Sequence, residues 1–176
     1  LDVRKVWPGG QDSIIALAIY QDRVIIFGTN NILLYTLPSD RNPANMTLTD
    51  TITGLGCIAR DSVIMVGGDL YFLALDGYYR LPRLAQVTSL LSAEKVSINV
   101  ADDFVASLSG ETLTKVRAGY NPNEGFLVLA LPAGNKTWCF HLDRAVPTGT
   151  PNAVVPAVTD WTNSAVAFRG FCYDAS

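Results

Sequence analysis

Residues 63–82 read VIMVGGDLYFLALDGYYRLP, and this stretch decides the expected fold. Three short apolar runs are separated first by Gly67-Gly68 and then by Asp76-Gly77. Glycine adopts the positive φ angles of tight turns without a steric clash, and Asp-Gly is a strong signal for a two-residue hairpin. Pro82 ends the last run because it has no N–H for a strand ladder. The stretch therefore predicts an antiparallel meander with strands at Val63–Val66, Leu70–Leu75 and Tyr78–Leu81.

The same pattern occurs earlier, in residues 17–35, which read LAIYQDRVIIFGTNNILLY. A shift of 46 positions places Leu17 on Val63 and Val24 on Leu70. It also places Asn30-Asn31, a second turn signal, on the Asp-Gly pair. No aligned pair is identical, so the repeat lies in the pattern of apolar and turn residues.

A looser copy follows, and its strands are expected at Ala118–Tyr120, Phe126–Leu131 and Thr137–Leu142. A period of 40–50 residues with several strands per unit is typical of propeller blades. We therefore expect a mainly β fold of antiparallel β-meander blades forming part of a β-propeller. Because propellers have about 4–8 blades, residues 1–176 are expected to be a single β-rich region of a longer chain. The blade-like units are expected at 14–37, 60–82, 118–142 and, in part, 164–176.

Residues 83–117 do not follow this rhythm and are expected to form a small, partly helical insertion. Apolar residues between Leu84 and Lys95 have helical spacing. A second, weaker helical pattern runs from Asp102 to Ser109, with Asp102 as its expected N-cap. Residues 143–160 contain three prolines and are expected to form a low-order connection, often an interaction element.

Composition limits the possible functions. Hydrophobic residues make up 49% of the chain and charged residues 16%, which excludes a disordered tail and suggests a surface partly covered by partners. The net charge of −3 and the singly scattered Arg residues disfavour tight nucleic-acid binding. The apolar runs are shorter than the roughly 20 residues that span a membrane.

The chain offers few groups for chemistry. His141 is the one histidine and is expected to be structural, since no second ligand has metal-site spacing. Asp102 and Asp103 are adjacent, and adjacent helical positions do not share a face, so a solvated helix start is preferred to acid–base work. Gly54-Leu55-Gly56 lacks the helix and the lysine of a phosphate loop. We expect no catalytic residue, no cofactor and no metal site.

Three further sets of residues have a structural and a functional interpretation. Cys57, Cys139 and Cys172 are expected to be buried free thiols, with one disulfide and a leftover thiol as the alternative. The pairs Tyr71-Phe72 and Tyr78-Tyr79 are expected to pack across strands, with a sugar-stacking platform as the alternative. Turn aspartates are expected to cap their own turns; these are Asp12, Asp22, Asp61, Asp69 and Asp76.

The two meanders together resemble a family of tailed-bacteriophage proteins, the tail hub, nozzle or DNA-stabilisation proteins. The resemblance rests on Asp22-Arg23 before an apolar strand, on Gly56-Cys57, on Ser62-Val63, and on the run from Gly68 to Leu73 with its following Asp-Gly. The resemblance covers residues 10–83, and residues 118–142 resemble the next blade of that family more loosely, whereas residues 143–176 depart from it.

This resemblance implies a non-enzymatic structural virion component located in the tail or neck. Its partners would be other copies of itself and neighbouring virion tail or neck proteins, around the channel used in DNA ejection. At most weak, transient DNA contact is implied, which suits a wall of low basicity.

Two rival functions remain open from the sequence. A β-rich receptor- or glycan-binding module would use the aromatic turns and the proline-rich connection. A propeller glycosidase would need two carboxylates, such as Asp102 and Glu124, converging at about 5–9.5 Å.

Overall fold

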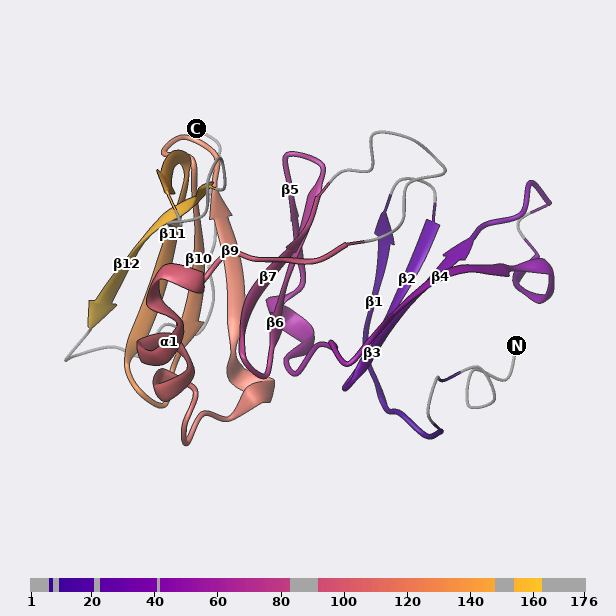
Figure 1. Ribbon diagram of the computed structural model, residues 1–176, viewed down its shortest axis with the longest axis horizontal. Helices are drawn as coiled ribbons and strands as arrows, with labels where there is room; N and C mark the ends of the chain where they lie inside the picture. Colours follow the sequence, from indigo (N-terminus) through magenta and orange to yellow (C-terminus); the bar gives the residue numbers. More distant parts are fainter. Residues whose placement is uncertain are drawn as a thin grey trace.

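The computed structural model describes residue 7 and residues 10–20, 23–40, 42–82, 92–147 and 154–162. Within these residues the chain is mainly β and forms three antiparallel sheets of four strands each. The sheets stand one behind another along the long axis of the molecule (Figure 1). The sequence-based expectation of a mainly β chain built from antiparallel meanders is therefore confirmed.

Each sheet takes its strands from consecutive chain segments, and neighbours in sequence are neighbours in the sheet. Sheet 1 contains β1 (Ile14–Tyr20), β2 (Arg23–Gly28), β3 (Asn31–Thr36) and β4 (Thr47–Thr53). Sheet 2 contains β5 (Ile64–Val66), β6 (Asp69–Ala74), β7 (Gly77–Leu81) and β8 (Glu94–Lys95). Sheet 3 contains β9 (Arg117–Asn121), β10 (Phe126–Leu131), β11 (Lys136–Pro147) and β12 (Val154–Thr162).

The 46-residue shift found in the sequence is also the structural repeat of the first two sheets. Strands β2 and β6 begin at Arg23 and Asp69, and strands β3 and β7 begin at Asn31 and Gly77. Both pairs of starting positions are 46 residues apart. Equivalent side chains therefore point to equivalent faces, because side chains alternate along a strand.

Each sheet has a forward face, directed at the next sheet in the chain, and a rear face, directed at the preceding one. The forward face of sheet 1 packs on the rear face of sheet 2 in one core; its main side chains are Ile25, Phe27, Ile32, Leu34, Leu70, Phe72 and Leu81. The forward face of sheet 2 packs on the rear face of sheet 3 in a second core; its main side chains are Tyr71, Leu73, Tyr78, Leu127, Leu129, Trp138 and Phe140. Full burial of one such side chain contributes about 1.5–3 kcal/mol.

The expected turns are partly confirmed. Gly67 and Gly68 have φ values of 61° and 92°, as a tight glycine turn requires. The following turn is formed by Leu75 and Asp76, because Ala74 pairs with Gly77. The sequence-based prediction placed this turn one residue later, at Asp76-Gly77, and that placement was wrong. A Cβ on Gly77 would lie 2.5 Å from Lys95 Cε and 2.7 Å from Ser97 Oγ, so glycine is needed there for close approach.

The described part of the insertion, residues 92–117, contains one α-helix, α1 (Ala101–Ser107), close to the expected position. Its buried Phe104 packs on Trp138 and Phe140 of sheet 3, with ring centroids 5.4 and 6.2 Å apart. The expected cap was wrong, because Val100 occupies the N-cap position and Asp102 lies within the first turn. Short 3-10 turns at Ile98–Val100 and Leu113–Lys115 flank the helix.

Two other expectations about the connections were wrong. Glu94 and Lys95, expected at the end of a helix, form β8 and pair with Arg80 and Tyr79. Residues 84–91 of that expected helix lie outside the described residues. Residues 143–160, expected to be of low order, contain the end of β11 and most of β12, which pair from Lys136–Thr162 to Pro147–Val154.

Proline is compatible with the strand β12 because β12 is an edge strand. Pro156 lies opposite Ala145, next to an irregularity in the register between His141 and Ala145. A proline at an edge or a bulge removes no ladder hydrogen bond that the sheet needs. The expected partial unit at 164–176 lies outside the described residues.

The remaining short elements are 3-10 turns at Pro43–Asn45 and Arg60–Ser62. In the described parts of the chain, no helix combines the length and the apolar character needed to cross a membrane.

Candidate functional site

The first strands of the three sheets lie at the same edge of the stack. Strands β1, β5 and β9 are each the terminal strand of their sheet, and β5 lies beside β9. The segment Arg60–Ser62 contacts both β1 and β9. This edge therefore brings together residues from all three sheets.

An open apolar groove of about 690 Å³ runs between β1 and β5. Its walls come from Ile14–Ile19 on one side and from Val63, Ile64 and Met65 on the other, with Arg60 at one end. Large apolar side chains are unusually exposed here: Leu17 is 64% exposed, Ile19 67% and Met65 53%. Exposed apolar patches of this kind mark contact surfaces more often than inert ones.

A smaller hollow of about 250 Å³ continues from the same end of β1. It shares Ile14, Ile15 and Arg60 with the groove and adds Asp61 and Leu113. The two hollows therefore follow β1 along its length and end at a charged cluster.

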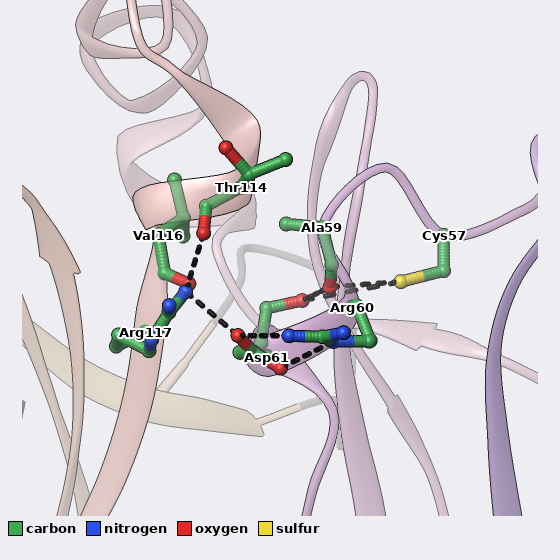
Figure 2. Close-up of polar contacts among 8 residues, drawn as sticks. Cys57, Ala59, Arg60, Asp61, Thr114, Val116 and Arg117 are labelled. Atoms are coloured by element: carbon green, nitrogen blue, oxygen red, sulfur yellow. Dashed lines mark hydrogen bonds and ion pairs between the residues drawn. The ribbon is translucent and has the colours of Figure 1, made fainter.

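The charged cluster consists of Arg60, Asp61 and Arg117 (Figure 2). Asp61 accepts from Arg60 Nε at 2.7 Å and from Arg60 Nη2 at 3.1 Å, and Arg117 Nη1 lies 2.8 Å from its second oxygen. The hydrogen bonds from Arg60 and the charge of Arg117 hold the pKa of Asp61 below its usual value, although burial acts against this. The cluster ties the segment before β5 to the start of β9.

Arg117 is held in place by its own backbone surroundings. Its Nη1 donates to the carbonyl oxygens of Thr114 at 2.7 Å and Val116 at 2.9 Å (Figure 2). Arg60, by contrast, has a side chain that is 74% exposed. Of these two guanidinium groups, Arg60 is therefore the one presented to solvent at the end of the groove.

Next to the cluster, the segment from Cys57 to Ser62 lies between the sheets, and its polar groups make hydrogen bonds to other groups of the protein. The Cys57 N–H donates to Gly28 O at 2.8 Å, and the Ser62 hydroxyl donates to Ala59 O at 2.7 Å while accepting from the N–H of Leu73. Burial raises the pKa of the Cys57 thiol to about 11. A thiol of that pKa is protonated at neutral pH and is a poor nucleophile.

The sequence-based interpretation of the cysteines is confirmed for the two that the structure describes. Cys57 and Cys139 are buried free thiols. Burial also raises the pKa of Cys139. Cys172 lies outside the described residues.

His141 is half-buried on β11 and lies 3.1 Å from Thr159 Oγ1, a hydrogen-bonding distance. Its ring also contacts Phe126 edge to face, with centroids 6.1 Å apart. These contacts fit the expected structural role. Asp102 and Asp103 are exposed in the first turn of α1, as expected of a solvated helix start. In the described residues no group of three His, Cys, Asp or Glu side chains is placed to hold a metal ion.

The aromatic pairs expected at the hairpins pack across strands. Phe72 stacks on Tyr79 with centroids 5.8 Å apart, and Tyr71 on Tyr78 at 6.3 Å. Tyr71, Phe72 and Tyr78 are buried, which removes them as a sugar-stacking platform. Tyr79 alone is half-buried, and its hydroxyl donates to Asp76 at 2.7 Å.

The turn aspartates behave differently from one another. Asp12 caps a turn that is not its own, accepting from the N–H groups of Thr29 at 2.8 Å and Asn30 at 3.0 Å in the β2–β3 turn. Asp76 accepts from side chains, Tyr79 and Lys95, and Asp69 lies 3.4 Å from Arg80 Nη1. Asp12 also accepts from the N–H of Ser13 at 2.7 Å, so it caps its own turn as well as the β2–β3 turn. Asp61 accepts from the side chain of Arg60. For Asp69 and Asp76 the expected self-capping stays a prediction, and Asp22 lies outside the described residues.

Sequence reasoning missed the groove and the charged cluster. The signal for the groove was present in β1, where Ile14–Tyr20 carries apolar side chains on both faces although it is an edge strand. The Asp61–Arg117 contact joins residues 56 positions apart and had no local signal. No protein-family model matches the chain, and comparison with curated proteins finds no significant match.

Proposed function

We propose that this chain is a non-enzymatic structural component of a tailed-bacteriophage virion, in a tail or neck hub or nozzle, and that its sheets are blades of a β-propeller. One observation carries the proposal: three consecutive four-stranded meanders stack face to face with their first strands at one edge. Blades of a propeller are arranged in this way. The resemblance of residues 10–83 to tail hub and nozzle proteins supplies the virion context.

The apolar edge supports a role in assembly. Its exposed side chains, Leu17, Ile19 and Met65, lie on the first strands, where side chains of a propeller face the axis or a neighbouring subunit. Contacts between subunits are made by such apolar patches surrounded by polar residues. We infer that the partners are other copies of the chain and neighbouring tail or neck proteins, with at most weak and transient contact to the DNA that passes.

The test is to find the chain in a particle. Virions of the phage that encodes it are purified, and peptide mass spectrometry asks whether the chain is present at a fixed ratio to the other tail proteins. Electron microscopy with an antibody against the chain then locates it, and we expect label at the tail or neck. Purified particles without the chain would overturn the proposal.

The rival receptor- or glycan-binding function keeps little of its sequence support, because three of the four aromatic side chains that suggested it are buried. A glycan array with the purified chain distinguishes the two. Specific binding there, together with absence from virions, would replace the structural role.

A further inference from the structure

The groove between β1 and β5 is bordered by the edge of a strand and not by its face. All residues of β1 from Ile14 to Ile19 line it. Because side chains alternate between the two faces of a strand, a groove on one face would be lined by every second residue. β1 is the terminal strand of sheet 1 and, among the described residues, pairs with β2 alone. Its outer backbone N–H and C=O groups therefore border the groove with no strand beside them in this part of the chain.

β1 lacks the features by which edge strands usually avoid pairing with another strand. Its sequence, IIALAIY, contains no charged residue and no proline. The irregularity in its register with β2 lies at its start, between Ile14 and Ala16, and the positions from Leu17 to Tyr20 pair regularly. By contrast, the edge strands β4 and β12 each contain an aspartate, β8 consists of two charged residues, and β5 has only three residues. Short edges and edges with charges resist pairing, so β1 is the edge best suited to receive a further strand.

The side chains at this edge are self-complementary. Residues 15–19 read IALAI, the same in both directions. In an antiparallel pair of two β1 strands centred on Leu17, Leu17 lies opposite Leu17 of the second copy, and Ala16 lies opposite its Ala18. Leu17 and Ile19 share one face of β1 and are 64% and 67% exposed, so this pairing covers them with apolar side chains of the second copy. On the other face Ala16 and Ala18 are small, which leaves room beside β5.

The two ends of the groove carry opposite charges. β1 and β5 begin at the same end, because Ile14 and Arg60 line both hollows. The charged cluster at that end contains two arginines and one aspartate, and Arg60 is 74% exposed. At the other end Asp69 lies opposite the last residue of β5 and shares Arg80 with Glu94, so this group has one negative charge in excess. A two-fold axis across β1 exchanges the ends and brings the positive end of one copy towards the negative end of the other.

We propose that two copies of the chain associate through β1, as an antiparallel pair with a two-fold axis at Leu17, so that sheet 1 continues from one copy into the other. A two-fold contact uses the same surface on both copies, and the palindromic edge with oppositely charged ends meets this requirement. Strand addition of this kind gains affinity from main-chain hydrogen bonds and specificity from alternate side chains. The inference rests on the proposed function for its setting and names the surface through which the copies assemble.

Sedimentation velocity of the purified chain over a wide range of concentrations tests this. We expect a monomer and a dimer with no larger species, because a two-fold contact closes on itself. A seven-residue edge is smaller than the about 800 Å² per partner of stable complexes, so the share of dimer should rise with concentration.

Leu17→Lys should abolish the dimer, since two like charges would lie directly opposite each other across the axis. Leu75→Lys is the matched control, because Leu75 is 77% exposed and lies on the β6–β7 turn, outside the lining of the groove, and it should dimerise like the parent chain. Circular dichroism confirms that each variant is folded. A parent chain that stays monomeric throughout overturns the inference and leaves the groove to a different protein, and a dimer that survives Leu17→Lys overturns it as well.

Single cysteines locate the axis and keep the test decisive if Leu17→Lys does not fold. In a Cys172→Ser background, Leu17→Cys should form a disulfide-linked dimer under mild oxidation, because residues directly opposite in an antiparallel pair have Cβ atoms about 4.5–5.5 Å apart. Ile19→Cys is the control on the same face of β1. Its two copies would be offset by about four positions, or roughly 14 Å, which is too far for a disulfide. Linking through Ile19→Cys in preference to Leu17→Cys, or through neither, would contradict the proposed pairing.

Dimerisation in solution and presence in virions are measured separately, so the two proposals fail separately. A chain present in virions but monomeric in solution removes this inference and leaves the proposed function standing. A dimer that forms through Leu17, in a chain absent from virions, does the reverse.

Discussion

The junction between sheets 1 and 2 and the junction between sheets 2 and 3 bury apolar faces in different ways. The first is mostly aliphatic, and the polar groups near it belong to the buried segment from Cys57 to Ser62. The second is aromatic and includes α1 and the Asp61–Arg117 ion pair. The spacing explains the contrast: β2 and β6 begin 46 positions apart, whereas β6 and β10 begin at Asp69 and Phe126. The additional residues before sheet 3 supply the helix that widens the second core.

The largest expected effect is the loss of one aromatic ring from each junction. Phe140→Ala removes contacts with Tyr78 and Phe104, and Phe27→Ala removes the contact with Phe72. Each should lower the free energy of unfolding by about 3–5 kcal/mol, with the larger loss for Phe140 because it contacts two rings.

Urea denaturation followed by circular dichroism measures both variants. Leu75→Ala serves as the control, since its exposed side chain should change stability by less than about 0.5 kcal/mol. If the sheets unfold together, both variants shift one common transition. Two separate transitions, each moved by one variant only, would mean that the junctions do not couple the three sheets.

The next pair of variants separates two costs in stability: the cost of a steric clash with a neighbouring backbone and the cost of a strained backbone conformation. A Cβ on Gly56 would lie 2.3 Å from the carbonyl carbon and oxygen of Thr29, which belongs to the turn of sheet 1. Gly56→Ala should therefore destabilise the chain by about 3 kcal/mol, because the backbone of the first junction must shift.

Gly54→Ala is the matched variant. Gly54 has φ of 76° and no atom within 4 Å of an added Cβ, so only the strained backbone should cost stability, by about 1 kcal/mol. Thermal unfolding of the two variants side by side gives the comparison. Equal losses would show that the close contact at Gly56 relaxes freely.

The sequence predicted the second sheet's hairpins and the repeat because those signals are local. Glycine adopts positive φ without a steric clash, so Gly67-Gly68 signals a tight turn from the sequence alone, and the apolar runs on either side fit strands. The sequence analysis assigned no forward or rear face, because these runs are apolar at consecutive positions and do not distinguish one face of a strand from the other.

The outer strands β8 and β12 could not be predicted from the sequence, and the reason is physical. Strand β8 is only Glu94–Lys95, two charged residues held by pairing with β7 and by contacts with Arg80 and Asp76. Strand β12 contains Pro156, which argues against a strand unless the strand is known to be an edge. The groove was missed because it depends on the placement of β1 against β5, residues about 50 positions apart.

A smaller effect compares one hydroxyl near each junction. Ser62 Oγ accepts from the buried N–H of Leu73 at 3.0 Å, whereas the half-buried Ser107 accepts through its Oγ from Trp138 Nε1 at 2.9 Å. Ser62→Ala leaves a fully buried donor unpaired and should cost about 2 kcal/mol. Ser107→Ala should cost about 1 kcal/mol, because a water molecule can take the place of a half-buried hydroxyl.

Urea midpoints of the two serine variants, measured at one pH, test the ranking. Ser109→Ala is a suitable control, because Ser109 lies in the exposed turn that follows α1. A larger loss for Ser107 than for Ser62 would show that the first junction admits water.

The smallest effect is electrostatic and belongs to the link across the second junction. In the folded chain, the hydrogen bonds that Asp61 accepts from Arg60, together with the charge of Arg117, lower the pKa of Asp61. Folding therefore favours the ionised carboxylate of Asp61. Its contribution is fully present above the unfolded pKa near 3.8 and is lost as the pH falls through the lower folded pKa. Asp61→Asn should therefore cost less than about 1 kcal/mol at neutral pH, since the pair is partly exposed, and this difference should shrink below about pH 4.

Asp102→Asn, on the exposed start of α1, provides the baseline for a surface aspartate. A difference between parent and Asp61→Asn that persists unchanged in acid would show that the carboxylate's shape, and not its charge, joins sheet 3 to the stack.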